Sequence, residues 1–239
     1  MAAQRSRSAD SGTLWFSPPD EGQDARRTLT RERVVTEALA IISADGAQAL
    51  SMRALATRLG VVPGALYRHV RNKEQLYDLM LDAVLAEVDR GADPAQPWAA
   101  QVTTLAQRLR AAVENHPGTA ALLKTRDPLS PASLALAEAF LASLLAAPMP
   151  APDAALAFRL IYDYTLGFAL ADTVSPAERR LRDAATRQEL HAFLRSLPSA
   201  RFPALAAHGT HAWEDDRDQR FAVGLRTIVR GFQAAQSGP

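Results

Sequence analysis

Cysteine is absent from this chain of 239 residues, and lysine occurs only twice, as Lys73 and Lys124. Without cysteine there can be no disulfide framework, no thiolate metal site and no cysteine nucleophile, which fits a reducing compartment. A strong charge bias is also missing, because the formal net charge is only +1. Nucleic-acid binding depends on where charge lies rather than on its sum, so local clusters must be sought.

Long apolar runs are scarce as well. The first ten residues, MAAQRSRSAD, lack the apolar core of a signal peptide. The most apolar later stretch, from Ala154 to Leu170, is interrupted by Arg159 and Asp163. We therefore expect a cytoplasmic protein without a membrane partner.

The N-terminal stretch, residues 1–27, mixes Ser, Gly, Pro, Asp and Arg without an apolar period. This composition is typical of a disordered arm. Its arginines, Arg5, Arg7, Arg26 and Arg27, could enter a DNA minor groove, or they could only keep a disordered tail in solution.

From Thr28 onward, apolar residues recur at steps of three and four, and no run alternates convincingly with period two. This periodicity predicts an all-α protein. The first helix should begin near Thr30 and end at Gly46. Later helices are expected at about 98–115, 117–125, 131–146, 153–174, 175–196 and 213–235, with a loop at 197–212.

Two short helices should follow the first. Ser51 is a suitable N-cap for one that ends at Gly60, and Pro63 starts the next. Asn72 then caps a long helix, with Gln75 at the capping-box position. A pair of short helices joined by a tight turn, with a preceding helix to pack on, has the dimensions of a helix-turn-helix.

The charges in this segment support DNA binding. Between Ser51 and Lys73 there is no Asp or Glu, although the whole chain is close to neutral. A one-sided basic segment of this kind suits phosphate. The basic residues are Arg53, Arg58, Arg68, Arg71 and Lys73.

The helix that begins at Pro63 has one apolar side. Leu66 and Val70 are spaced to point inward, which leaves Gly64 and Ala65 on the outer surface. Small side chains there allow the helix to approach DNA closely.

Larger polar side chains share this outer surface. Tyr67 can meet a thymine methyl or a phosphate, and Arg68 can donate two hydrogen bonds to guanine. His69 and Lys73 lie where phosphate contacts are expected.

Residues 50–81, LSMRALATRLGVVPGALYRHVRNKEQLYDLML, closely resemble the DNA-binding domain of TetR-type repressors. The resemblance covers about residues 30–90 and includes small residues at Ala54 and Ala56, the Leu-Gly-Val turn, the Leu-Tyr-Arg-His-Val helix and the following Asn-Lys. The later run FAVGLRTIVRGF resembles the last helix of the tetracycline-repressor-like subgroup.

This resemblance implies an N-terminal three-helix helix-turn-helix DNA-binding domain, 28–74, and a larger helical ligand-binding and dimerisation domain, 75–239. A homodimer would bind palindromic operator DNA and release it when a small-molecule effector binds. Val62 departs from the family, because a polar residue often caps the recognition helix there. By position, the implied DNA contacts are Arg53, Ala65, Tyr67 and Arg68 toward bases or sugars, and Tyr67, His69 and Lys73 toward phosphates.

The helix at 153–174 is apolar around most of its circumference, which a surface helix would not be. Gly224 and Gly231 could let the last helix pack closely against it. Burial inside one subunit would explain this pattern, and so would a four-helix interface shared by two subunits, which the family resemblance also implies.

We expect an effector pocket of mixed polarity among the helices at 98–174, because aromatic residues and isolated charges occur together there. An apolar ligand with one or two polar groups would suit it. Each charged candidate could equally be a paired group in a helical core. The candidates are Phe158, Tyr162, Phe168 and Asp172 as lining, with His116 or Arg126 closing the pocket.

Two other function classes compete with this interpretation. The chain could be a ligand-independent regulator or activator whose larger domain only dimerises. An enzyme is disfavoured, because there is no Gly-rich phosphate loop, His-Glu metal motif or nucleophile elbow. His208 and His211 lie three apart in an expected loop without a neighbouring ligand cluster, so we expect no metal site and no cofactor.

Overall fold

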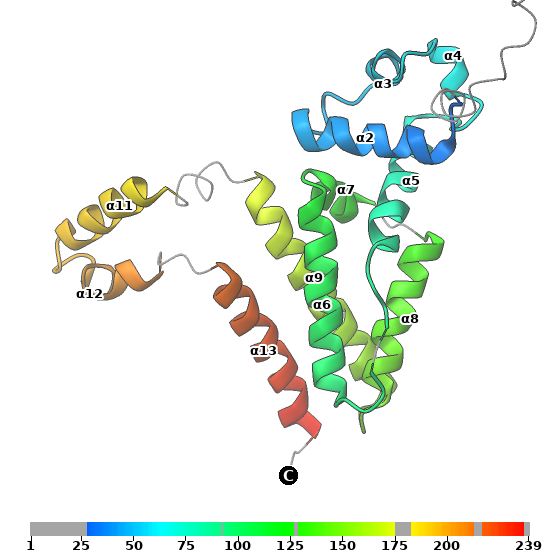
Figure 1. Ribbon diagram of the computed structural model, residues 1–239. Helices are drawn as coiled ribbons and strands as arrows, with labels where there is room; N and C mark the ends of the chain where they lie inside the picture. The colour runs from blue at the N-terminus through cyan, green and yellow to red at the C-terminus, as the bar shows by residue number, and fades with distance from the viewer. Residues whose placement is uncertain (1–27, 92, 127–128, 175–182, 213–216, 237–239) are drawn as a thin grey trace, which may run out of the picture. The chain divides into compact units, whose positions relative to one another are not determined.

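The computed structural model describes residues 28–91, 93–126, 129–174, 183–212 and 217–236, without the side chains of 172–174 and 212. The chain divides into two units, 1–30 and 31–239, and of the first only residues 28–30 are described. The expected arm at 1–27 therefore lies outside the described residues. All regular elements in the described ranges are helices (Figure 1), which confirms the all-α prediction.

Three helices make up the helix-turn-helix. They are α2 (Arg31–Asp45), α3 (Met52–Leu59) and α4 (Pro63–Leu66). Helix α2 packs on α3, which in turn packs on α4. The buried side of α2 is apolar and consists of Val34, Val35, Ala38, Leu39, Ile41 and Ile42.

Local capping sets the ends of α3. The Ser51 hydroxyl accepts a hydrogen bond from the Ala54 amide at 3.1 Å, as expected for an N-cap. At the other end Gly60 adopts φ +69°, a left-handed conformation that side chains with a Cβ disfavour. Its amide donates to the Thr57 carbonyl at 3.2 Å, so the chain turns sharply toward α4.

Helix α5 (Lys73–Ala86) follows the helix-turn-helix. Asn72 Oδ1 accepts from the Gln75 amide at 2.8 Å, which confirms the expected cap. The Gln75 side chain accepts from the Arg71 amide at 2.6 Å, one residue before the N-cap, so the return bond of a capping box forms one position early.

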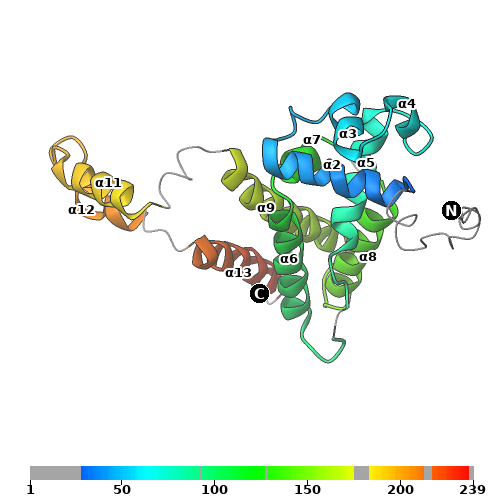
Figure 2. The ribbon, with the colours of Figure 1, turned by 45° about the horizontal axis from the view of Figure 1, so that its top comes forward.

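The larger domain is built around α9 (Ala151–Val174). This helix packs against α6 (Trp98–Asn115), α7 (Thr119–Thr125), α8 (Pro131–Leu145) and α13 (Arg217–Gln236). Figure 2 shows α6, α8 and α9 side by side below the helix-turn-helix. Helix α5 packs on both α2 and α8 and so belongs to both parts.

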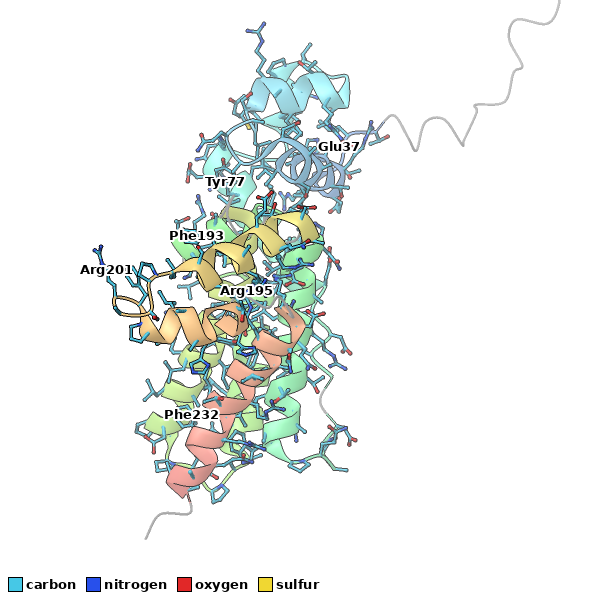
Figure 3. All side chains as sticks on the ribbon, turned by 90° about the vertical axis from the view of Figure 1, so that its left-hand side faces the viewer. Glu37, Tyr77, Phe193, Arg195, Arg201 and Phe232 are labelled. Atoms are coloured by element: carbon cyan, nitrogen blue, oxygen red, sulfur yellow. The ribbon has the colours of Figure 1, made fainter. Side chains whose placement is uncertain are left out.

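The expected loop at 197–212 is wrong, because Pro203–Ala212 forms helix α12, which packs against α11 (Ala184–Ser196). The expected helix start at 175–178 lies outside the described residues. Helix α11 is capped instead by Asp183, whose carboxylate accepts from the Thr186 amide at 2.8 Å. Figure 3 labels Phe193 on α11 and Arg201 in the turn before α12.

Close packing of α13 on α9 is confirmed at Gly224 and not at Gly231. A Cβ at Gly224 would come within 2.2 Å of the Tyr164 hydroxyl, whereas one at Gly231 would meet no described atom within 4 Å. The Tyr164 hydroxyl donates toward the carbonyls of Arg220 and Phe221, each at 3.2 Å.

The first 21 residues of α9 are long and apolar enough to cross a membrane, but the core helices of soluble proteins often meet the same two criteria. Arg159 and Asp163 lie within this stretch and pair with each other at 3.3 Å.

Candidate DNA-binding surface and effector site

In the α4 region, residues 63–70, the structure confirms which side chains were expected to point inward and which outward. Leu66 and Val70 are buried, whereas Gly64 and Arg68 are exposed and Tyr67 is 53% exposed. Ala65, His69 and Lys73 are half-buried. Helix α4 has only one turn, but the Arg68, His69 and Val70 amides continue the winding by donating to Ala65 and Leu66.

The basic residues of this region differ in how they are paired. Arg58 Nε lies 2.8 Å from the Glu37 carboxylate on α2, so its charge is partly neutralised within the domain. Arg53 and Arg68 are exposed and form no ion pair with any described residue. An exposed guanidinium without an internal partner is available to a base edge or a phosphate.

The start of α4 has an open hydrogen-bonding position. Val62, the N-cap, makes no side-chain cap bond, so an amide of the first turn remains for phosphate or water. A Cβ at Gly64 would meet no described atom within 4 Å, so Gly64 has no packing role in the protomer. Both features suit a helix end that faces an anionic backbone.

One contributor to this surface was not expected from the sequence. Arg31, the first residue of α2, donates from Nε to the His69 carbonyl at 3.3 Å. This bond ties α2 to the end of residues 63–70, which we call the recognition segment. The two residues are 38 apart, and no local pattern brings them together.

Lys73 begins α5 and lies against an aromatic ring. Its Nζ is 5.3 Å from the centre of the Tyr77 ring, and the Arg126 guanidinium lies over the same ring at 5.4 Å. Arg126 also pairs with Glu74 at 2.5 Å and with Asp78 at 3.1 Å. Arg126 therefore joins the end of α7 to the first turns of α5, and these contacts do not place it in the expected pocket.

Phe158 and Tyr162 lie together, as expected. Their ring centres are 5.7 Å apart, and Phe140 of α8 lies 5.7 Å from Phe158 on its other side. Phe158 and Tyr162 line a hollow of about 320 Å³ between α8 and α9. The rest of its lining was not predicted as ligand-binding and consists of Leu129, Ser133, Leu134, Leu136, Ala137 and Arg159.

Phe168 lies elsewhere on α9. Its ring contacts Phe221 of α13 at 5.2 Å, and the guanidinium carbons of Arg110, Arg217 and Arg220 lie within 6 Å of its centre. Phe168 therefore belongs to the junction of α6, α9 and α13, not to the hollow beside Phe158.

A charged network surrounds this junction. Arg110 is 8% exposed, and its guanidinium donates to Glu114 and Asp218, each at 2.6 Å. Burial by itself lowers the pKa of Arg110, but the two carboxylates raise it more, so the pKa is raised above its ordinary value. Burial also raises the pKa of the Tyr164 hydroxyl, against the opposing effect of Arg110 and Arg220. The charged groups are thus paired within the protein.

The remaining pocket candidates are not brought together either. His116 Nε2 lies 2.8 Å from the Glu87 carboxylate at the end of α5. Asp172 is in α9, but its side chain lies outside the described residues. The six predicted ligand residues thus do not surround a single described cavity. Among the described residues there is no group of three or more potential metal ligands, and His208 and His211 lie on α12.

A helix-turn-helix that exposes two arginines without an ion-pair partner among the described residues, joined to a larger helical domain, is an arrangement typical of a DNA-binding regulator. Residues 34–80 match the family model "Bacterial regulatory proteins, tetR family", and residues 90–236 match "Tetracyclin repressor-like, C-terminal domain". The chain belongs to the TetR family of transcriptional regulators.

Proteins similar to this chain include HTH-type transcriptional regulators. An HTH-type transcriptional regulator of Saccharopolyspora erythraea is 33% identical over 93% of this chain and 92% of its own length. The HTH-type transcriptional repressor DrrR1 of Streptomyces coeruleorubidus is 31% identical over 92% of this chain and 83% of its own. The crystal structure of apo ActR from Streptomyces coelicolor has a TM-score of 0.77 at 32% identity, covering 87% of this chain and 97% of that one.

Proposed function

We propose that this regulator reads a palindromic operator through α3 and the α4 region. The observation that carries this assignment is the exposure of Arg53 and Arg68 without an ion-pair partner in the described residues, beside the open surface at Gly64. Arg68 supplies base-directed hydrogen bonds, and Lys73 supplies a phosphate contact. The complete proposed DNA-contact set is Arg53, Gly64, Ala65, Tyr67, Arg68, His69 and Lys73.

The test compares Arg68→Ala with Lys73→Ala on a selected operator and on scrambled DNA. Loss of a base contact should cost about 1–3 kcal/mol at one symmetric pair of operator positions and relax specificity there. Loss of a phosphate contact should weaken both DNAs alike and reduce the salt slope by about 1. Equal losses on both DNAs for the two variants would contradict the assignment of Arg68 to base reading.

We further propose a two-fold homodimer through α9 and α13. Leu156 and Leu160 on α9 are 53% and 45% exposed, and Val223 on α13 is 43% exposed. Exposed leucines one helical turn apart form an apolar stripe of the kind that marks an interface. A dimer would present two recognition segments to half-sites about one helical turn, ~34–36 Å, apart.

An effector that weakens operator binding completes the proposal. The related ActR has been crystallised with actinorhodin and with (S)-DNPA, and a TetR variant from Acinetobacter baumannii with minocycline. In this chain, the hollow beside Phe158 and Tyr162 offers aromatic surface together with the Ser133 hydroxyl and the Arg159 guanidinium. Such a lining suits an apolar ligand that carries one or two polar groups.

Linkage gives this part of the proposal its test. A ligand that releases DNA must bind the DNA-bound protein more weakly by the same factor, and a coupling of ~1–3 kcal/mol changes affinity about 5- to 150-fold. A thermal-shift screen followed by operator titration measures both sides. Effector control would be contradicted by ligands that bind the wild type, do not bind the Phe158→Ala variant and leave operator affinity unchanged.

A further inference from the structure

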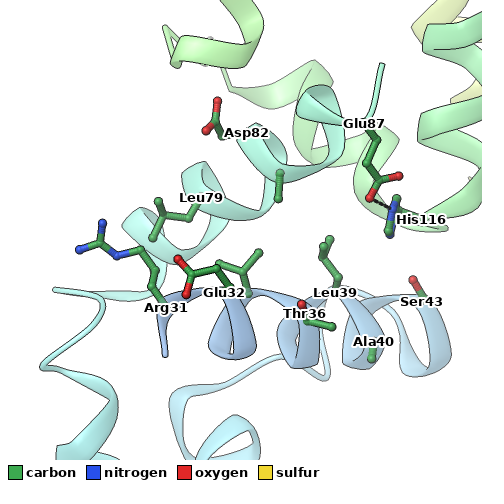
Figure 4. A pocket seen from close by; sticks show the side chains of 12 residues that line it. Arg31, Glu32, Thr36, Leu39, Ala40, Ser43, Leu79, Asp82, Glu87 and His116 are labelled. Carbon is green, nitrogen blue, oxygen red and sulfur yellow. Dashed lines mark hydrogen bonds and ion pairs between the residues drawn. The ribbon is translucent and has the colours of Figure 1, made fainter. Parts of the chain in front are cut away.

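A second concave surface lies next to the DNA-reading elements, away from the hollow beside Phe158. It is a groove of about 560 Å³ between α2 and α5. Figure 4 shows Arg31 and Glu32 at one end, and Glu87 and His116 at the other. We call it the α2–α5 groove.

The floor of the α2–α5 groove is apolar. Val35 and Leu39 come from α2, and Leu79 and Ala83 come from α5. These four side chains give the groove an apolar lining, against which a hydrocarbon body would remove apolar surface from water.

Among the described residues that line the groove, carboxylates outnumber basic groups. Three carboxylates, those of Glu32, Asp82 and Glu87, line the groove, against one guanidinium and one imidazole. The Arg31 guanidinium donates to the His69 carbonyl, and the imidazole is hydrogen-bonded to Glu87. Asp82 Oδ1 accepts from the Ala132 amide, and a carboxylate keeps further lone pairs for a ligand.

We propose that the α2–α5 groove is a second ligand site, which takes an organic cation with an apolar body. The apolar floor sets the shape of the occupant, and the acidic rim sets the sign of its charge. A carboxylate ligand of the same shape would meet repulsion from the rim and should bind much more weakly.

Occupancy of this groove would act on DNA binding. Helix α2 holds the end of the recognition segment through Arg31 and holds α3 through the Glu37–Arg58 pair. The opposite wall, α5, begins at Lys73, a proposed phosphate contact. A ligand between α2 and α5 therefore contacts both elements that orient the reading surface, and by linkage its affinity depends on bound DNA.

The test uses the full chain and a matched pair of probes, 4-phenylbutylammonium and 4-phenylbutanoate, in isothermal titration calorimetry. One cation should bind each protomer, and the anion should not bind measurably. In a Glu32→Gln, Asp82→Asn variant, which keeps side-chain shape and the acceptor for Ala132, the cation should bind about fivefold more weakly or worse.

Ala40→Trp, which places a large ring in the groove, should abolish binding, because Ala40 belongs to its lining. Matched controls are Glu138→Gln and Ala142→Trp on exposed positions of α8, which line none of the described pockets and should leave binding unchanged. Thermal melting of each variant checks folding, and the isosteric double variant decides if the tryptophan variant does not fold.

Operator titrations with and without the cation complete the experiment. The wild type should change its operator affinity in the presence of the cation, and the double variant should not. Equal binding of both probes, or cation binding that survives in both groove variants, would overturn the site. Binding without any change in operator affinity would overturn its regulatory role. Failure of the unliganded wild type to bind operator would count against the proposed DNA-reading surface, whereas the calorimetry judges the groove independently.

Discussion

The Arg126 guanidinium covers the ring of Tyr77, with Cζ 5.4 Å from the ring centre, while its nitrogens pair with Glu74 and Asp78. This side chain is 22% exposed and joins α7 to α5 across 52 residues of sequence. The contact combines a planar cation on an aromatic face with two carboxylates, a geometry that lysine cannot reproduce.

We expect Arg126→Ala to lower the free energy of unfolding by about 1–2 kcal/mol, because a cation–π contact and two ion pairs are lost together. The free energy of unfolding of Arg126→Lys should lie between those of Arg126→Ala and the wild type. Urea denaturation measures this. The control is Arg159→Ala, whose single exposed pair should contribute less than about 0.5 kcal/mol. A denaturation midpoint for Arg126→Ala equal to that of the control would show that the contact contributes no more than a single exposed ion pair.

Gly64→Ala should separate folding from DNA binding. Its Cβ would meet no described atom, and alanine favours helix over glycine, so stability should be unchanged or rise by up to about 1 kcal/mol. Operator affinity should fall, because the methyl group would stand between α4 and the DNA. Thermal melting and operator titration give the two readouts. Unchanged operator affinity would remove Gly64 from the proposed contact set.

Leu160→Glu should dissociate the dimer and leave each protomer folded, because this side chain is exposed on α9. Leu225→Glu should instead unfold the larger domain, since Leu225 is 1% exposed. Leu145→Glu, at an exposed leucine on α8, is the matched control. Sedimentation equilibrium with circular dichroism distinguishes the cases. A Leu160→Glu protein that remains dimeric would contradict the proposed interface.

Asp183 should make the start of α11 sensitive to acid. Hydrogen bonds from the Thr186 amide and hydroxyl lower the pKa of its carboxyl below the ordinary value. Because the folded-state pKa is the lower one, the cap contributes fully above the unfolded-state pKa, about 3.9, and is lost as pH falls through the folded-state value. The Thr186 amide chemical shift should titrate with a midpoint below that of an ordinary aspartate. Asp183→Asn, which still accepts a hydrogen bond, should abolish that titration, and a midpoint near 3.9 in the wild type would contradict the expectation.

Short-range features of this fold were predictable from the sequence because their causes are local. The caps at Ser51 and Asn72 and the left-handed turn at Gly60 each depend on residues within four positions. Helix α12 was missed because its run PALAAHGTHA has almost no large apolar residue to show a period. Its packing depends on α11, where Leu194 lies 3.4 Å from the position of a Cβ at Gly209.

The pairing of side chains across helices was decided by the tertiary structure. Phe158 and Tyr162 are one turn apart on α9, so their proximity follows from helical geometry. Phe168 comes ten residues after Phe158 and lies on another side of a helix with 3.6 residues per turn. Helix α13 rather than α8 covers it. The links from Arg31 to His69 and from Arg126 to Glu74 span 38 and 52 residues. Sequence periodicity does not predict such long-range contacts, because they depend on how the helices pack and not on how each one forms.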